Sequence, residues 1–254
     1  SDALADFLSD EGVTILRGVS YQSIKRTKNG VALSLAVDGK DEVVEAEEVL
    51  ASVGRSPNTY GLGLGNRGVE LRPDGGIQVD EYLRTTNPDI YAAGDVRGRD
   101  MYVYMAAYGA KLAARNAVAS EALIYDNATM PWVVFSDPQV AGVGSSEAQA
   151  RAAGHEVVTS VLPLDAVPRA LAARDTRGLI KLVAEAGSKR LLGAQILAPE
   201  GADSIQTAAM AMKARLTYEE LGDTIMPYLT TVEGLKLAAQ TFEKDVAALS
   251  CCAG

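Results

Sequence analysis

The sequence predicts an α/β segment followed by an α+β unit. Two observations lead to this fold class. In the first half, a short apolar run ends in Gly94-Asp95 and a long helical stretch follows it, as strands and helices alternate in α/β proteins. From Met130 onward, strand-like runs and helical stretches follow in an order that favours helices packed on an antiparallel sheet.

The length and composition of the chain exclude several classes of protein. Its 254 residues, 48% of them hydrophobic, suffice for one large domain or two ordinary ones. The net charge of −9 argues against nonspecific binding to nucleic acid or anionic membranes, because both need clustered Lys and Arg. No apolar run approaches the roughly 18 residues that span a bilayer, and the first residues do not resemble a signal peptide. We therefore expect no nucleic-acid partner and no membrane partner.

Short strands dominate the expected structure of the first half. A helix over residues 2–11 is expected to end at Gly12. Three of the following runs alternate apolar and polar residues, and the turn sequences Lys28-Asn29-Gly30 and Asp38-Gly39-Lys40 separate them, which predicts hairpins. The expected strands lie at residues 13–17, 20–26, 31–37, 42–44, 48–53 and 89–93, and a second helix covers residues 101–119.

The second half is expected to contain strands followed by helices. Its start is marked by a change of composition at Met130-Pro131. Neither an internal repeat nor a low-complexity stretch interrupts it. The strands are expected near residues 132–135, 156–163, 178–184 and 191–198, and the helices near residues 146–153, 203–215, 218–224 and 232–247.

One glycine-rich run matches a nucleotide-binding motif by letter only. Gly63-Leu64-Gly65-Asn66-Arg67-Gly68 has the G-x-G-x-x-G spacing, which binds a dinucleotide when a strand enters the first glycine and a helix leaves the last. Here a Pro-Asn-Thr-Tyr loop precedes the glycines, and a strand-like run stopped by proline follows them. We interpret the run as a surface loop, so the sequence contains no complete nucleotide-binding βαβ unit.

The strand end at Gly94-Asp95 is a better candidate for a binding site. Ligands bind at the carboxyl ends of strands in open α/β sheets, and glycine permits their close approach. The Asp95 carboxylate can accept hydrogen bonds from sugar-like hydroxyls, while the following helix directs its positively polarised N-terminus at an electron-rich ring. Taken alone, such an ending is as often an ordinary turn.

Three ordered motifs resemble the pyridine nucleotide–disulfide oxidoreductase family. Thr86-Asn87-Pro88-Asp89-Ile90-Tyr91-Ala92-Ala93-Gly94-Asp95 resembles the family's second flavin motif, T-x-x-x-x-[YF]-A-x-G-D. Residues 53–58 resemble its connecting G-R-x-P-N segment, and residues 135–144 resemble the start of its dimerisation domain. The resemblance covers essentially the whole chain.

The resemblance implies how the chain is divided. Residues 1–55 would be the trailing part of a nicotinamide-binding domain, residues 56–129 the return and central segment of a flavin domain, and residues 130–254 a dimerisation domain with a C-terminal Cys-Cys tail. The fold would be a remnant of the NAD(P)/FAD-binding region followed by a C-terminal α+β dimerisation domain. A half-domain also exposes sheet edges that favour pairing, so a homodimer is expected.

The family's cofactors, FAD and NADPH, are implied in the same way. By resemblance, Asp95 would hold the flavin ribityl chain, with Gly94 beside it. The backbone near Val103, at the start of the next helix, would face the isoalloxazine ring.

The C-terminal segment resembles the mercuric reductases, a branch of this family. Relatives that reduce disulfides carry a His near the C-terminus and a Glu five residues later as a proton-handling pair. Tyr228 stands in place of that His, and Glu233 keeps its spacing, so both are candidate catalytic residues. The only histidine, His155, lies in a Gly-His-Glu turn and is interpreted as a solvated residue. Residues 167–172 and 232–254 also resemble the mercuric reductases.

The two cysteines of the chain, Cys251 and Cys252, are adjacent. They cannot join distant parts of a fold, so a secreted disulfide framework is excluded and the cytoplasm is the expected compartment. Two thiolates near a terminus can bind a soft cation such as Hg(II) and pass it on by ligand exchange. The other interpretation is an inert tail. By resemblance, the pair would capture Hg(II) and deliver it to a redox dithiol beside the partner's flavin, with Tyr228 helping at the metal.

Three segments with which the family's reductases begin are not in this sequence. They are a flavin-binding fingerprint, a C-x-x-x-x-C redox pair and a nicotinamide-binding fingerprint, and the chain also begins without Met. We therefore expect part of a mercuric reductase that does not reduce Hg(II) by itself. There are two alternatives. The first is a non-enzymatic, Hg(II)-binding dimerisation module. The second is a fragment of another flavin disulfide reductase, and Tyr228 in place of the His argues against it.

Overall fold

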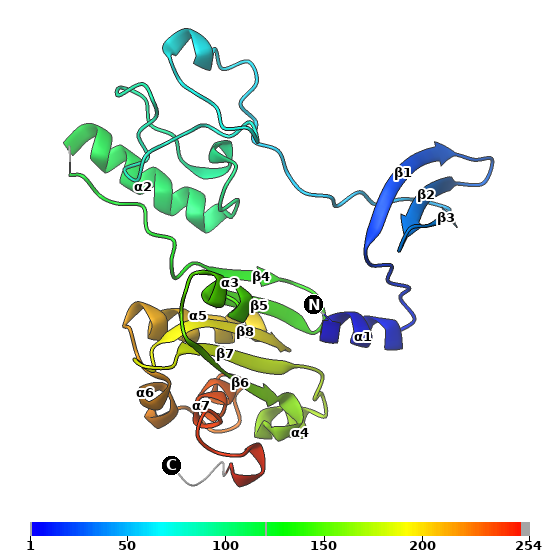
Figure 1. Ribbon diagram of the computed structural model, residues 1–254, viewed down its shortest axis with the longest axis vertical. Coiled ribbons are helices and arrows are strands. Elements are labelled where there is room, and N and C mark those ends of the chain that lie inside the picture. The colour runs from blue at the N-terminus through cyan, green and yellow to red at the C-terminus, as the bar shows by residue number, and fades with distance from the viewer. Residues whose placement is uncertain (1, 120, 250–254) are drawn as a thin grey trace. The chain divides into compact units, whose positions relative to one another are not determined.

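The computed structural model describes residues 2–119 and 121–249, which form two compact units (Figure 1). One unit contains the residues up to Arg17 together with those from Asn127 onward, and the other contains residues 18–126. The predicted division after residues 55 and 129 follows family domains rather than compactness, and it stays a prediction. None of the described helices combines the length and the apolarity that a bilayer span requires.

A three-stranded antiparallel sheet begins the unit of residues 18–126. Val37 lies opposite Lys40 across the second hairpin, and both turn residues are left-handed, Asp38 at φ 49° and Gly39 at φ 79°, as a type I′ turn requires. The predicted hairpins are thus confirmed. In sheet order the strands are β1 (Val19–Arg26), β2 (Val31–Val37) and β3 (Lys40–Ala46).

Two of the predicted strands are wrong. Residues 13–17 and 48–53 have irregular backbone. Their apolar side chains face solvent, with Leu50 90% and Val53 84% exposed. A strand needs a neighbour for its backbone hydrogen bonds, and neither run has one among the described residues. An apolar run favours a strand, but the strand forms only where another strand lies beside it.

The rest of this unit consists of turns around one long helix. The helix α2 (Val103–Ala119) confirms the second predicted helix, whereas the predicted strand at residues 89–93 is reduced to a single bridge between Arg84 and Tyr91. Two 3-10 turns precede α2, at Leu64–Arg67 and Gly94–Arg97. Small apolar clusters pack the segment, one with Val69, Ile77 and Ala92, the other with Leu83, Leu112 and Ala113.

The other unit is built on a five-stranded antiparallel sheet of order β4-β5-β8-β7-β6 (Figure 1). The second strand, β5, is not among the predicted strands because Gly142 and Gly144 are poor strand formers. A Cβ at Gly142 would lie 2.4 Å from the Trp132 indole, so a larger residue there would have to displace this ring. The strands are β4 (Pro131–Val134), β5 (Gln139–Gly144), β6 (Val157–Pro163), β7 (Leu179–Glu185) and β8 (Leu191–Ala198).

Helices cover both faces of this sheet. On one face, α5 packs on β5 and β8, while α7 packs on β6 and β7 and carries α6 beside it. On the opposite face, Ala150 of α3 packs with Val183 of β7. The helices are α1 (Asp2–Asp10), α3 (Glu147–Ala152), α4 (Pro168–Ala173), α5 (Gly201–Lys213), α6 (Tyr218–Asp223) and α7 (Glu233–Gln240).

Two helical predictions need correction. The helix expected over residues 232–247 ends at Gln240, where the Thr241 hydroxyl donates to the Ala238 carbonyl at 2.9 Å, and only a 3-10 turn at Val246–Ala248 follows. The short helix α4 is not predicted, although Pro168 occupies its first turn, a position that proline favours.

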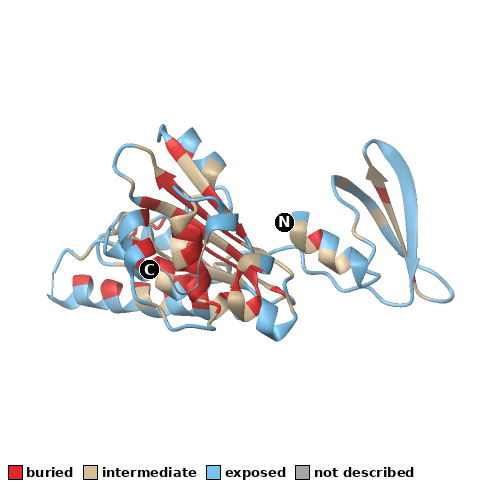
Figure 2. Cartoon of the chain, turned by 90° about the horizontal axis from the view of Figure 1, so that it is seen from below, coloured by how far each residue is buried: buried red, intermediate tan, exposed pale blue. Residues whose placement is uncertain are grey.

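The main hydrophobic core lies between the five-stranded sheet and the helices α5 and α7. Leu182 of β7 is fully buried in it, while the next residue, Val183, belongs to the small cluster on the opposite face. This alternation follows from the period of two along a strand. Figure 2 shows the buried residues concentrated in this unit. Each fully buried Leu or Ile contributes about 1.5–3 kcal/mol.

The guanidinium of Arg177 faces three carboxylates, and one of them, Glu11, lies in the segment after α1. The guanidinium lies 2.8 Å from Asp175, 3.1 Å from Asp137 and 2.8 Å from Glu11. The hydrogen bond from Arg177 holds the pKa of Asp175 below its ordinary value.

Replacing Arg177 with Gln is expected to lower the melting temperature at pH 7, and the loss should shrink as the pH falls below about 4. A carboxyl with a depressed pKa stabilises the fold above its ordinary pKa, and this contribution is lost as the pH falls through the depressed value. Thermal unfolding across this pH range tests the prediction, with Arg17→Gln at the more exposed pair with Asp2 as the control, which is expected to change the melting temperature little. An equal loss at every pH contradicts it.

Candidate functional site

The Gly94-Asp95 turn lies in the loop that leads into α2. Gly94 is buried at φ 76°, and a Cβ there would lie 3.1 Å from the Ala106 side chain, so both backbone and packing favour glycine. The Asp95 side chain is 54% exposed, and its Oδ2 lies 3.7 Å from Nη1 of Arg55. Another nitrogen of Arg55 donates to the Met101 carbonyl at 2.5 Å. The result is an accessible carboxylate on a firmly held turn.

The first residues of α2 present an apolar surface to solvent. Val103 is its first residue and is 84% exposed. The rings of Tyr102 and Tyr104 stack beside it with centroids 5.3 Å apart, and burial raises the pKa of Tyr104 above its ordinary value. An exposed apolar helix start suits the face of a planar, electron-rich ring.

These groups fit one side of a flavin site. Asp95 offers acceptors for the hydroxyls of a ribityl chain, and Val103 lies at the positively polarised end of α2. Ala106 occupies the space that a side chain at position 94 would take, so Gly94 allows the tight turn that presents Asp95. The rejected glycine motif is different. Its residues form the 3-10 turn Leu64–Arg67, with no strand entering it and no α-helix leaving it, so its interpretation as a loop is confirmed.

The second predicted site lies in the turn between α6 and α7. Tyr228 is 57% exposed there, and the next residue, Leu229, adopts φ 60°, a conformation that costs a leucine about 1 kcal/mol or more. The Thr230 hydroxyl donates to the Pro227 carbonyl at 2.8 Å. The phenol of Tyr228 therefore stands on a turn that is closed by its own hydrogen bonds.

Glu233 lies below this turn at the start of α7. It is 5% exposed, and its Oε2 accepts a hydrogen bond from the Leu229 backbone N–H at 3.2 Å. The sequence predicts Glu233 as the partner of residue 228. In the structure its carboxylate holds the backbone of the neighbouring residue, which fixes the turn that carries Tyr228.

The thiol pair Cys251–Cys252 lies outside the described residues. The chain leading to it is described up to Leu249, and there it is anchored. Phe242, Val246 and Leu249 are partly buried against the main core. The two cysteines thus begin two positions beyond an anchored residue.

His155 lies outside both candidate sites. Its Nδ1 is 3.0 Å from Oε1 of Glu185, and this hydrogen bond holds the pKa of Glu185 below its ordinary value. The side chain is 40% exposed, as expected for a solvated residue, but the pair with Glu185 joins distant positions and was not predicted. Within the described part of the chain, no group of three or more His, Cys, Asp or Glu side chains is arranged to hold a metal ion.

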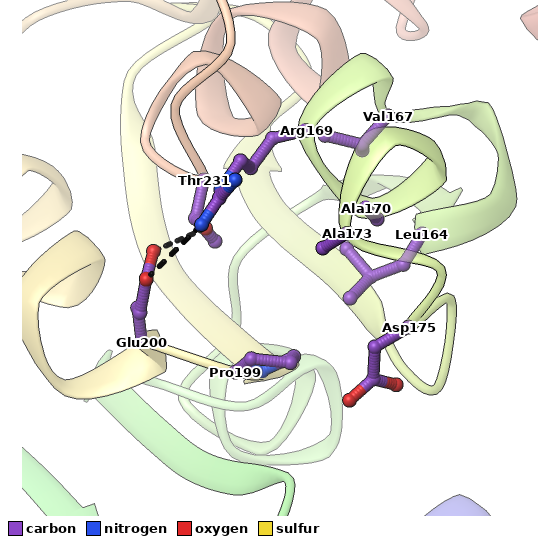
Figure 3. A pocket seen from close by; sticks show the side chains of 9 residues that line it. All are labelled: Leu164, Val167, Arg169, Ala170, Ala173, Asp175, Pro199, Glu200 and Thr231. Atoms are coloured by element: carbon purple, nitrogen blue, oxygen red, sulfur yellow. Dashed lines mark hydrogen bonds and ion pairs between the residues drawn. The ribbon is translucent and has the colours of Figure 1, made fainter.

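A cavity of about 170 Å³ lies beside the Tyr228 turn (Figure 3). Glu200 receives a hydrogen bond from the Thr231 hydroxyl at 2.9 Å and lies 3.7 Å from Arg169, and Figure 3 shows these three side chains converging at one side of the cavity. The sequence does not predict this cluster, because its members come from three elements far apart in the chain. The cavity is also lined by Leu164, Val167, Ala170, Ala173, Asp175 and Pro199.

Two family models match most of the chain. The model described as pyridine nucleotide-disulphide oxidoreductase matches residues 1–114, and the model of the dimerisation domain of the same family matches residues 130–239. The predicted fold class is confirmed by these matches. A solved structure described as LpdA from Mycobacterium tuberculosis has a TM-score of 0.83 and 28% identity over 96% of this chain and 53% of its own. The flavoprotein disulfide reductase RclA from Escherichia coli has a TM-score of 0.81 and 30% identity over 96% and 55%.

Curated relatives are more similar in sequence. A protein named mercuric reductase from Staphylococcus aureus is 44% identical over 254 residues, which are 100% of this chain and 46% of that protein. A second from Shigella flexneri is 53% identical over 211 residues, 83% of this chain and 37% of that protein. The chain thus spans less than half the length of either relative.

Proposed function

This chain belongs to the pyridine nucleotide–disulphide oxidoreductase family, and from that premise we propose that it is the C-terminal part of a mercuric reductase. The observation that carries the proposal is the 44% identity to a mercuric reductase over every residue of the chain. The flavoprotein disulfide reductase RclA has the same fold at only 30% identity.

The chemistry of the C-terminal unit supports this branch of the family. Tyr228 replaces the His of disulfide reductases, and the only histidine, His155, is paired with Glu185. A phenol cannot take up a proton at neutral pH as an imidazole does. The Tyr228 phenol would instead offer an oxygen to an incoming metal ion. Glu233 holds the turn that carries this tyrosine through its hydrogen bond from the Leu229 backbone N–H.

Cys251 and Cys252 capture Hg(II), which is the substrate. Each thiol gives up its proton, two mercury–sulfur bonds form, and two bonds from mercury to its incoming ligands break, so the step involves no change of oxidation state. Transfer to a second pair of thiolates repeats this exchange. The thiols of the tail therefore deliver Hg(II), and the electrons come from elsewhere in the complete enzyme.

FAD and NADPH are the cofactors of the proposed enzyme, and FAD, once reduced by NADPH, would supply the two electrons that convert Hg(II) to Hg(0). Asp95, Gly94 and Val103 would hold one side of it. Residues 130–254 would form the homodimer contact, which the match of residues 130–239 to a dimerisation domain supports. We place the enzyme in the cytoplasm, where unpaired thiols persist.

A second function is favoured by one observation. The sequence contains no cysteines besides the tail pair, so the isolated chain has no second dithiol to receive Hg(II). On its own it would act as a dimerising, Hg(II)-binding module without turnover.

The proposal is tested by assaying NADPH oxidation in the presence of Hg(II). The isolated chain is expected to show none, while a gene product that joins this chain to the family's flavin and nicotinamide segments is expected to consume NADPH only when Hg(II) is added. A visible spectrum after incubation with FAD and desalting shows whether the chain alone retains the cofactor. A complete product that reduces disulfides and leaves Hg(II) unchanged contradicts the proposal.

A further inference from the structure

Glu200 occupies a position that suits its side chain poorly. It is the N-cap of α5, yet it makes no side-chain capping bond, and its backbone is left-handed at φ 61°. Ser, Thr, Asp or Asn is favoured at an N-cap, and glycine is favoured at this φ. The carboxylate reaches instead to a different part of the unit, where it accepts the Thr231 hydrogen bond and faces Arg169.

These contacts join three segments. Arg169 belongs to α4, Glu200 connects β8 to α5, and Thr231 lies in the turn that carries Tyr228. The Arg169–Glu200 pair is half-exposed at 3.7 Å, so it contributes little. Thr231 is 8% exposed, so a lost partner would leave its hydroxyl poorly solvated, and the 2.9 Å bond to Glu200 is the stronger tie.

The cavity lies beside the polar contacts of Glu200. Its 170 Å³ lie next to these side chains, so close packing does not fill the space between α4, Pro199 and Thr231 (Figure 3). The hydrogen bond from Thr231 to Glu200 lies at one side of this space and ties the turn before α7 to the start of α5. The Tyr228 turn is held by Glu233 through Leu229 and by Glu200 through Thr231.

We propose that Glu200 is a positioning residue, which sets the placement of the Tyr228 phenol through its hydrogen bond to Thr231. The inference rests on the proposed function for the role of Tyr228 at Hg(II), and the placement itself is a property of this chain. The backbone strain at Glu200 is then retained because its side chain reaches Thr231.

The variants separate positioning from stability. Glu200→Gly removes the bridge but relieves the left-handed strain, so its melting temperature should stay close to that of the unmodified chain. Thr231→Val removes the hydroxyl at nearly constant volume, and Thr231→Ser restores it. Arg169→Gln removes only the exposed ion pair and serves as the matched control.

The readout is the ring-carbon resonance of Tyr228 in the chain labelled at the tyrosine Cζ position, assigned with Tyr228→Phe. We expect Glu200→Gly and Thr231→Val to shift or broaden this resonance, while Thr231→Ser and Arg169→Gln leave it in place. Fluorescence of Trp132, the only tryptophan, checks that each variant is folded. An unmoved Tyr228 resonance in folded Glu200→Gly overturns the inference, even if Thr231→Val fails to fold.

Turnover by the complete enzyme separates the two proposals. If Tyr228→Phe lowers kcat for Hg(II), Glu200→Gly is expected to lower it in the same direction, and Arg169→Gln is not. If Tyr228→Phe leaves turnover unchanged, the proposed role of the phenol fails, while a shifted resonance in Glu200→Gly still supports the positioning.

Discussion

Replacing Cys251 and Cys252 together with alanine is expected to lower the affinity of the chain for Hg(II) by several orders of magnitude. Hg(II) is a soft cation that prefers thiolate to the oxygen and nitrogen ligands left after the change. These are the only cysteines of the chain, and the described residues contain no cluster of metal-ligating side chains that could take their place.

Equilibrium dialysis against a competing small thiol measures this loss. Each single variant keeps one thiolate and is expected to bind with intermediate affinity. Affinity in the unmodified chain should rise with pH up to the ordinary cysteine pKa of about 8.5, because binding displaces a proton from each thiol. Near-normal binding by the double variant would falsify the assignment of the metal site.

The largest loss of stability is expected from Gly178→Ala. Gly178 precedes β7 with φ 137°, and a Cβ there would lie 1.9 Å from the Leu197 carbonyl oxygen of β8. That oxygen belongs to backbone in the middle of the sheet, so the clash cannot be relieved by a side-chain rotation. Backbone strain and overpacking together are expected to cost about 3 kcal/mol or more.

Gly187→Ala is the matched control for this prediction. Gly187 lies in the turn between β7 and β8, and a Cβ there meets nothing within 4 Å. Urea unfolding followed by Trp132 fluorescence compares the two variants, since Trp132 lies on β4 of the same sheet. Equal urea midpoints for Gly178→Ala and Gly187→Ala would contradict the prediction, because they would show that the backbone between β7 and β8 accommodates an added methyl group.

The elements that the sequence predicts well are those with strong local signals. The hairpins around residues 28–30 and 38–40 follow from turn residues that tolerate left-handed backbone. Helix α2 and four strands of the five-stranded sheet follow from apolar spacing. The fifth strand, β5, is not predicted because its glycines have low strand propensity. Residues 13–17 and 48–53 carry the same local signal without a neighbouring strand, so there the prediction fails.

For the candidate sites, the sequence by itself determined which chemical groups are present. The Gly94-Asp95 ending, a tyrosine at position 228 with a glutamate five residues later, and the adjacent thiols can all be recognised in the sequence. The tertiary structure decided what Glu233 and Glu200 do, because their partners, the Leu229 backbone and the Thr231 hydroxyl, depend on backbone conformation and on chain segments that meet only in the fold. Residue type and spacing specify a carboxylate, but only folding determines the group that faces it.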